Sequence, residues 1–243
     1  MNDKIIEVKN LSKSFDNNLI INNISFDVYK GEIISIVGTS GCGKSTILNI
    51  LSNTDKNYNG LINIKSKNIG YMYQEPALFP WFTIKKNAYL ACDIKKYNNY
   101  NFIDKYLVKY GLKNYLNMYP RSLSGGMKQR LSLIRTLSIN PEILLLDEPF
   151  GALDYQTRLL IIEDLYKLVK ENNITVILIT HDISEAISLS DRVIVLSNKP
   201  CNIKKIYNID LINKSTPLFN RQDDNFSYYY ENIGKDLDLL NEK

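Results

Sequence analysis

The chain has 243 residues, of which 44% are hydrophobic and 23% charged, and this composition is ordinary for a soluble globular protein. Such a length can bury a substantial core and is expected to form one domain, with room for a subdomain. A formal net charge of +4 is too small to indicate binding to nucleic acid.

The first part of the chain has the pattern of β-strands. Apolar residues alternate over residues 5–8 and 19–28, and a turn is expected at 30–32. Residues 33–37 form a short continuous apolar run, which is typical of a buried parallel strand. A glycine-rich loop at 38–43 follows, and then a helix from Lys44 to about Leu51. Short strand-like pieces occupy residues 58–73.

The second part alternates between helices and buried strands. Residues 83–139 are mostly helical in pattern, and Asn140-Pro141 ends the last helix. Apolar strands are expected at 143–146, 175–180 and 192–197, with helices around 161–168 and at 183–190. This alternation predicts a parallel sheet covered by helices. We expect a single domain over 1–243, with a core at 1–82 and 140–210, a helical subdomain at 83–139, and a tail at 211–243. The tail could be a packing helix or a regulatory segment.

The cysteines and the apolar runs limit where the protein works. Cys42, Cys92 and Cys201 show no C-x-x-C spacing, so they support neither a disulfide framework nor a zinc site. No apolar run approaches the roughly 18–20 residues that span a bilayer. The first residues lack the apolar segment of a signal peptide. We therefore expect reduced thiols in the cytosol, with another protein as the anchor if the chain works at a membrane.

The loop G-T-S-G-C-G-K-S at 38–45 satisfies the phosphate-loop pattern G-x-x-x-x-G-K-[ST] in full. Its glycines let backbone N–H groups surround phosphates, Lys44 can reach the β- and γ-phosphates, and Ser45 offers a hydroxyl to Mg²⁺. Cys42 is either a small packing residue or a thiol whose alkylation blocks the nucleotide. We predict nucleotide contacts along the whole loop: Gly38, Thr39, Ser40, Gly41, Cys42, Gly43, Lys44, Ser45 and Thr46.

Two carboxylates follow the apolar strand in I-L-L-L-D-E-P at 143–149. They stand at the carboxyl end of the strand, where ligands bind in open α/β sheets. Adjacent strand residues point to opposite sides, which suits divided roles. We expect Asp147 to hold Mg²⁺ through water and Glu148 to polarise the attacking water.

A further motif, L-S-G-G-M-K-Q-R at 123–130, has the character of a helix start that attracts an anion. Ser124 is a suitable N-cap, and Gly125 and Gly126 leave backbone N–H groups uncovered. A phosphate is the expected anion at such a helix start.

From Phe15 to His181 these motifs resemble, in kind and order, those of ATP-binding-cassette (ABC) ATPases, and the likeness covers residues 4 to about 210. The resemblance implies an α/β fold: a P-loop NTPase core with a mostly parallel sheet, an N-terminal antiparallel β subdomain and an inserted α-helical subdomain. It also implies that Ser124, Gly125 and Gly126 hold the ATP of a second copy.

The resemblance assigns roles to residues that are weak evidence alone. His181, the only histidine, resembles the switch histidine that contacts the γ-phosphate, and Gln74 resembles the Q-loop glutamine that reaches Mg²⁺ and the attacking water. Phe15 stands where the family stacks an aromatic ring on adenine. Asp154 ends a G-A-L-D segment similar to the D-loop that touches the opposite subunit. The implied catalytic set is Lys44, Gln74, Glu148 and His181, and the implied metal set is Ser45, Gln74 and Asp147.

Within the family, Q-E-P-A-L-F-P-W at 74–81 and P-F-G-A-L-D at 149–154 look most like importers of the nitrate, sulfonate and taurine type. This implies an ATPase at the cytoplasmic face of the cell membrane that works with a second copy of itself or a homologous ATPase, with separate permease subunits and, indirectly, with an external solute-binding protein. Phe79, Pro80 and Trp81 are either core residues or a surface for a partner.

Two other functions stay open at this point. One is a soluble ABC ATPase of DNA repair, chromosome maintenance or translation, which the chain's lack of a coiled-coil insertion, zinc cysteines or a second cassette disfavours. The other is a cassette that regulates without hydrolysis, which the presence of Lys44, Glu148 and His181 disfavours.

Overall fold

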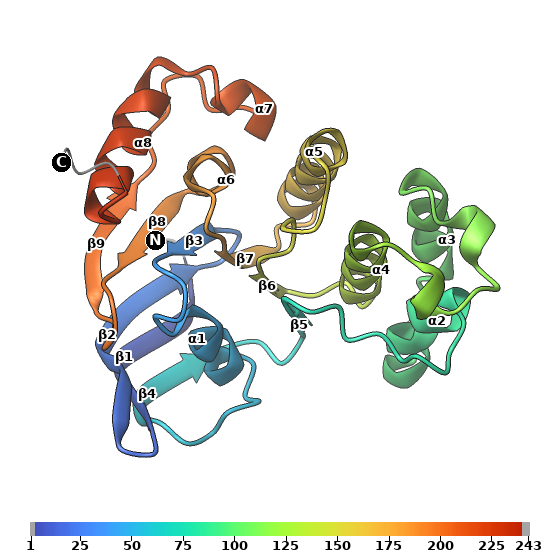
Figure 1. Ribbon diagram of the computed structural model, residues 1–243, viewed down its shortest axis with the longest axis horizontal. Helices are drawn as coiled ribbons and strands as arrows, with labels where there is room; N and C mark the ends of the chain where they lie inside the picture. Colours follow the sequence, from blue (N-terminus) through green and yellow to red (C-terminus); the bar gives the residue numbers. More distant parts are fainter. Residues whose placement is uncertain (1–2, 240–243) are drawn as a thin grey trace.

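The computed structural model describes residues 3–239, and the strands of this part form two sheets (Figure 1). The smaller, antiparallel sheet has the order β2-β1-β4, with β1 (Lys4–Phe15), β2 (Asn18–Tyr29) and β4 (Asn59–Ile64). The larger sheet has the order β5-β6-β7-β3-β8-β9. Its strands are β3 (Ile33–Val37), β5 (Ile69–Met72), β6 (Ile143–Asp147), β7 (Thr175–Ile179), β8 (Arg192–Leu196) and β9 (Ile203–Asn208).

The larger sheet is parallel except at one edge, where β9 pairs antiparallel with β8. Every residue of β3, β6 and β7 is buried, which explains why these strands are continuous apolar runs in the sequence. The strand expected at 33–37 is confirmed. The strand expected at 143–146 includes Asp147, and the one expected at 175–180 ends at Ile179.

Each face of the larger sheet packs against its own hydrophobic cluster. Ile143 and Leu145 of β6 join the apolar residues of α1 (Lys44–Leu51) and of the antiparallel sheet. Leu144 and Leu146 join those of α4 (Gly125–Leu137) and α5 (Tyr155–Glu171) on the other face. Successive side chains of a strand point to opposite faces, so one short strand contributes to both clusters.

The helices between β5 and β6 lie to one side of the sheets (Figure 1, green). They are α2 (Ile84–Lys95), α3 (Tyr100–Lys109) and α4, with 3₁₀ turns η1 (Lys113–Tyr115) and η2 (Pro120–Ser122) before α4. Leu131, Ile134 and Leu137 form the buried stripe of α4 that their helical spacing predicts. The predicted fold class is confirmed; the limits 83–139 of the helical subdomain remain a prediction.

The C-terminal segment packs on the core. Helix α8 (Asp224–Asp236) lies beside α6 (Ile183–Leu189), with α7 (Pro217–Asn220) before it (Figure 1, red). Ile233 and Leu237 are buried against Ile187 and Tyr207. The segment after residue 210, for which the sequence allowed either a packing helix or a regulatory segment, therefore contains a packing helix. Within residues 3–239, no helix combines the length and the apolar character needed to cross a membrane.

Candidate functional site

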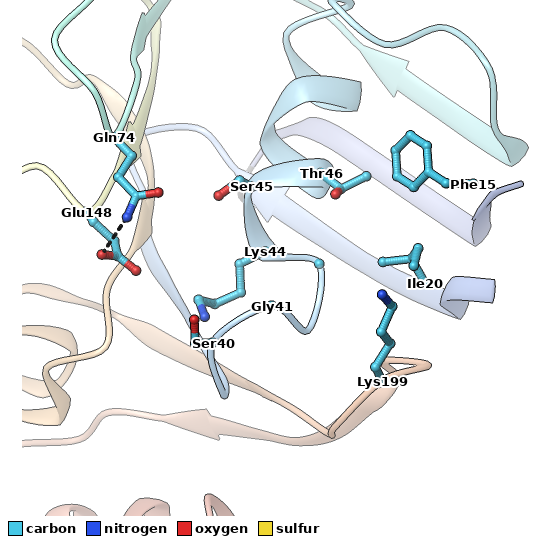
Figure 2. Close-up of a pocket in the computed structure, with 11 residues that line it drawn as sticks. Phe15, Ile20, Ser40, Gly41, Lys44, Ser45, Thr46, Gln74, Glu148 and Lys199 are labelled. Atoms are coloured by element: carbon cyan, nitrogen blue, oxygen red, sulfur yellow. Dashed lines mark hydrogen bonds between the residues drawn. The ribbon is translucent and has the colours of Figure 1, made fainter. Parts of the chain in front are cut away.

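A cavity of about 300 Å³ opens at the carboxyl end of β3, where the glycine-rich loop leads into α1 (Figure 2). It gathers residues from the β1–β2 hairpin, the loop, the ends of β5 and β6, and the β8–β9 turn. Its lining residues are Phe15, Ile20, Ser40, Gly41, Gly43, Lys44, Ser45, Thr46, Gln74, Glu148 and Lys199. This is the edge of a parallel sheet where the strand ends form a crevice for ligands.

The glycine-rich loop takes a backbone path that favours glycine at two positions. Gly41 and Gly43 have φ angles of +75° and +116°, in the left-handed region. Gly43 is also the residue before the first turn of α1, whose leading N–H groups have no partner within the helix. The loop and the helix start therefore present backbone N–H donors to the cavity, which favours an anion.

Lys44 is buried and carries its ammonium group inside the loop. Nζ donates hydrogen bonds to the carbonyl oxygens of Gly38, at 2.9 Å, and Thr39, at 3.0 Å. Two neutral carbonyls orient the cation without neutralising its charge. An anion in the cavity would therefore find Lys44 already positioned.

Two other loop residues turn away from the cavity. Cys42 is buried in the cluster that includes α1, and burial raises the pKa of its thiol. This favours the packing interpretation over that of an accessible, reactive thiol. Thr39 donates a hydrogen bond through Oγ1 to Asn198 Oδ1, at 2.7 Å, which ties the loop to the β8–β9 turn. Gly38, Thr39 and Cys42 can contribute only backbone groups to a ligand in this cavity.

The carboxylate of Asp147 has the surroundings expected of a cation ligand. Its side chain is buried, and Oδ1 has no hydrogen-bond partner among residues 3–239. Burial raises the pKa of this carboxyl, which the hydroxyl of Ser45 beside it and Lys44 partly oppose. A buried, unpaired carboxylate oxygen next to a hydroxyl matches the oxygen donors that Mg²⁺ prefers. The residues present thus fit the predicted magnesium ion.

The side chain of Glu148 lies next to those of two other predicted catalytic residues. Its Oε2 accepts a hydrogen bond from Gln74 Nε2, at 3.1 Å, and lies 3.3 Å from His181 Nδ1 (Figure 2 shows the first contact). The three residues follow β5, β6 and β7, which are neighbours in the sheet, so their carboxyl ends converge. Glu148 also has a φ of +46°, a strained conformation for a residue with a side chain, and such strain concentrates at functional sites.

Phe15 forms the far wall of the cavity. It ends β1 and is about half exposed, at 47%, with its ring beside the cavity. The Lys13 ammonium group lies 4.6 Å from the ring centroid and is itself held by Asp55 in an ion pair of 2.7 Å. An aromatic ring fixed in this way offers a face for stacking.

The residues of L-S-G-G-M-K-Q-R do not line this cavity. Ser124 caps α4 as predicted, since its Oγ accepts a hydrogen bond from the Met127 N–H at 3.3 Å. The start of α4 packs instead on the G-A-L-D segment: Gln129 Oε1 accepts a hydrogen bond from Ala152 N at 3.0 Å. A Cβ on Gly126 would stand 3.0 Å from the Ala152 carbonyl oxygen. The segments 123–130 and 151–154, both expected to face a second copy, thus pack against each other.

Asp154 has a structural contact of its own. Its Oδ1 accepts a hydrogen bond from the Thr157 N–H at 3.0 Å, so it caps α5. Like Ser124, Gly125 and Gly126, it is absent from the lining of the cavity. In a single chain, these four predicted nucleotide-binding residues are therefore separate from the others.

The exposed aromatic residues near Gln74 sit on a well-organised loop. Trp81 is 66% exposed, and its ring centroid lies 5.5 Å from that of Phe79. The buried Asn87 of α2 fixes the loop, because its Oδ1 accepts from Phe79 N and its Nδ2 donates to the carbonyl oxygens of Phe79, Phe82 and Thr83. Trp81 is therefore not a core residue, which favours the partner-surface alternative.

Sequence reasoning missed two residues of the cavity, Ile20 and Lys199. Ile20 belongs to a strand whose alternation marks it only as a core residue. Lys199 stands in an N-K-P-C turn that carries no ligand signature. Only the tertiary fold brings these residues to the phosphate loop.

Comparison with known proteins finds relatives whose names agree with one another. The family described as ABC transporter matches residues 21–151. The chain is 39% identical over 231 residues to the uncharacterized ABC transporter ATP-binding protein YtlC of Bacillus subtilis, covering 90% of this chain and 89% of YtlC. It is 38% identical over 210 residues to the aliphatic sulfonates import ATP-binding protein SsuB of Bacillus licheniformis, covering 82% of each.

Two further comparisons concern transport and structure. The chain is 37% identical over 212 residues to the bicarbonate transport ATP-binding protein CmpC of Synechococcus elongatus, covering 80% of this chain and 32% of CmpC. A dimeric structure of a post-hydrolysis state of the ATP-binding cassette MJ0796, bound to ADP and Pi, superimposes with a TM-score of 0.75. It is 30% identical and covers 84% of this chain and 99% of that one.

Proposed function

Because this chain belongs to the ABC transporter family and is an ATP-binding, ATP-hydrolysing subunit of the importer type, we propose that it powers uptake of a small solute through separate membrane subunits. The resemblance seen in the sequence is thereby confirmed at the level of the family. The proposed cargo class is nitrate-, sulfonate- or taurine-like, or a related small molecule such as bicarbonate. Names among the relatives support it, since SsuB is named for aliphatic sulfonates and CmpC for bicarbonate.

The observation that carries the proposal is the convergence of Gln74, Glu148 and His181 beside the cavity that holds Lys44. In the proposed complex, adenine stacks on Phe15 and the phosphates lie along the glycine-rich loop. Lys44 binds the β- and γ-phosphates. Backbone N–H groups at the start of α1 supply the remaining donors.

Ser45, Asp147 and Gln74 are the proposed holders of magnesium. The buried Oδ1 of Asp147, which has no hydrogen-bond partner among residues 3–239, supports this assignment. Magnesium, when bound, supplies positive charge that offsets the charge on the phosphates. The role of these residues is to place oxygen donors around the ion.

The three convergent residues have distinct proposed tasks. Glu148 accepts a proton from the attacking water, and Gln74 orients this water and the carboxylate. His181 contacts the γ-phosphate. Phosphoryl transfer depends mostly on positioning and charge neutralisation, and three side chains fixed on neighbouring strand ends provide the positioning.

A second copy is the proposed source of the missing donors. Ser124, Gly125 and Gly126 stand at a helix start that suits a phosphate but does not reach the cavity of its own chain. In a head-to-tail pair with two-fold symmetry, each copy would offer this helix start to the ATP of its partner. Asp154 would lie at the same interface, because its segment packs on the start of α4. Closing with ATP and reopening after hydrolysis would supply the work of transport.

The loop that carries Trp81 is the proposed docking surface for the permease. A large exposed aromatic residue on a fixed loop has the character of a binding anchor. The loop follows Gln74 directly in the chain, so docking there can act on the catalytic residues. Docked in this way, the subunit would lie at the cytoplasmic face of the membrane, with the solute-binding protein on the opposite side.

Replacement of the proposed base tests the mechanism. Glu148→Gln keeps the shape of the side chain but removes its basicity, and should lower turnover by roughly 10²–10⁴-fold while ATP still binds. If Glu148→Gln hydrolyses ATP at the wild-type rate, the assignment of the base is wrong. The cargo is tested separately, by co-purifying the permease and its solute-binding protein and screening the latter for ligands by thermal shift.

A further inference from the structure

A second lysine reaches the nucleotide cavity from a distant part of the chain. Lys199, in the turn between β8 and β9, lines the same cavity as Phe15, Ile20 and Gly41. Figure 2 shows its side chain extending from the turn toward Ile20, with the ammonium group between the Phe15 side of the cavity and the glycine-rich loop. Neither the phosphate-loop pattern nor any other motif of the sequence includes it.

The turn that carries Lys199 is fixed to both sides of the cavity. On one side, Asn198 accepts the hydrogen bond from Thr39 of the phosphate loop at 2.7 Å. On the other side, Cys201 pairs with β2: its N–H donates to the Ile20 carbonyl at 2.8 Å, and its carbonyl accepts from Asn22 N at 2.9 Å. Residues on both sides of Lys199 are thus attached to elements that line the cavity, so its approach to the cavity is a property of the fold.

The charge of Lys199 has no partner among residues 3–239: no ion pair or hydrogen bond engages its ammonium group. Lys13, by comparison, is paired with Asp55, and Lys44 donates to two carbonyls. An unpaired cation in the wall of a cavity that already carries Lys44 adds positive potential there. Such a cavity favours a polyanionic ligand.

We propose that Lys199 is an additional ATP-binding residue that contacts the α-phosphate. This inference rests on the proposed function, because that function places adenine at Phe15 and the β- and γ-phosphates at Lys44. The α-phosphate then lies between the two, on the side of the cavity that Lys199 faces. Charge-assisted hydrogen bonds from an ammonium group to a phosphate oxygen are among the stronger polar contacts.

This contact acts on affinity and leaves the hydrolysis step alone. The α-phosphate carries the same charge before and after the γ-phosphate leaves, so Lys199 stabilises the bound substrate and the transition state equally. Loss of such uniform binding raises KM and leaves kcat unchanged. Lys199 therefore differs from Lys44, whose partners include the transferred group.

Equilibrium titration of the subunit with Mg·ATP, Mg·ADP and adenosine tests the proposal. For Lys199→Ala we expect roughly 3- to 10-fold weaker binding of ATP and ADP, the size of an ion pair that is partly screened by solvent. For Lys199→Ala, the affinity for adenosine and kcat at saturating ATP should both equal the wild-type values. Lys199→Arg should bind ATP and ADP as the wild type does. Lys205→Ala is the matched control, since it removes an exposed charge from β9 that does not line the cavity.

If Lys199→Ala binds ATP as the wild type does while Phe15→Ala binds it weakly, the proposal for Lys199 is wrong and the nucleotide site stands. If Lys199→Ala weakens adenosine as much as ATP, or Lys205→Ala weakens ATP equally, a specific phosphate contact is excluded. If the wild-type subunit itself binds no ATP, the proposed function fails together with this inference.

Discussion

The carboxylate of Glu148 faces the imidazole of His181, with Oε2 of the first 3.3 Å from Nδ1 of the second. The two residues follow β6 and β7, which are paired in parallel register, so the sheet itself fixes their separation. The same oxygen accepts the hydrogen bond from Gln74. A carboxylate that accepts a hydrogen bond from one neighbouring strand end and lies beside the imidazole of another is positioned before any ligand binds, which is what catalysis by positioning requires.

Replacing His181 with Ala should lower ATP turnover by about 10²-fold, the usual cost of losing one donor to a reacting phosphate or oxyanion. The affinity for ATP should change much less, because Lys44 and the loop remain. Phosphate release at saturating ATP measures the turnover, and an equilibrium titration measures the affinity. Wild-type turnover of His181→Ala would contradict the assignment.

Ser124→Arg should abolish hydrolysis and leave ATP binding by the single chain intact. The start of α4 does not line the cavity of its own chain, so a large side chain there leaves that cavity unchanged. It would, however, fill the space proposed for the phosphates of a partner. Paired measurements of turnover and of ATP affinity check the prediction. Loss of ATP binding by monomeric Ser124→Arg would show that the helix start serves its own chain.

Asp147→Asn should make the ligand-free protein more stable at neutral pH. Burial raises the folded-state pKa of Asp147 above its ordinary value of 3.8, so the folded chain holds this proton more tightly than the unfolded chain does. Stability therefore falls as pH rises from 3.8 through the raised pKa, and stays lower above it. Removing the charge should therefore raise the free energy of unfolding at pH 7.

Urea unfolding at neutral and acid pH, with and without Mg²⁺, measures this effect. The advantage of Asp147→Asn should disappear in acid, where Asp147 is protonated in both states. Mg²⁺ should stabilise the wild type and not the variant. An Asp147→Asn protein that is less stable than the wild type at neutral pH, or equally stabilised by Mg²⁺, would contradict a metal-binding carboxylate.

Gly126→Ala and Gly125→Ala form a matched pair at the start of α4. A Cβ at position 126 would lie 3.0 Å from the Ala152 carbonyl oxygen, which is shorter than an ordinary van der Waals contact. At position 125 the nearest contact would be an ordinary 3.4 Å to Ala152 Cβ. We expect Gly126→Ala to lose about 1 kcal/mol of unfolding free energy through overpacking. Gly125→Ala should lose nothing, because alanine favours helix. Equal stability of the two variants in urea would contradict the packing of α4 on residues 151–154.

The sequence was most informative where local pattern and chemistry coincide. The phosphate loop between a continuous apolar strand and a helix, and the carboxylates after the apolar run at 143–146, could be located because strand ends in parallel sheets carry such groups. The contact between Glu148 and Gln74 depends on β5 pairing with β6, which no local pattern specifies. The sequence motifs named both residues without showing that they touch.

Other features were missed or, like the C-terminal helix, left open between alternatives, for identifiable reasons. Strand β9 buries only one residue well, Tyr207, because it is an edge strand, so its pattern looks like a polar loop. Helix α8 is rich in Tyr and Asn, which are weak helix formers, although Phe226, Tyr229 and Ile233 have helical spacing. Lys199 approaches the cavity only through long-range hydrogen bonds to Thr39 and β2.

We propose that ATP is held between two copies of the chain, and that hydrolysis with Glu148 as the base lets the copies separate. The most direct measurement is the molar mass of Glu148→Gln in solution, by light scattering after size-exclusion chromatography, with and without ATP. We expect a monomer without nucleotide and a stable dimer with ATP, and no dimer when Ser124→Arg is added to the same chain. A Glu148→Gln protein that binds ATP and remains a monomer would contradict the shared site.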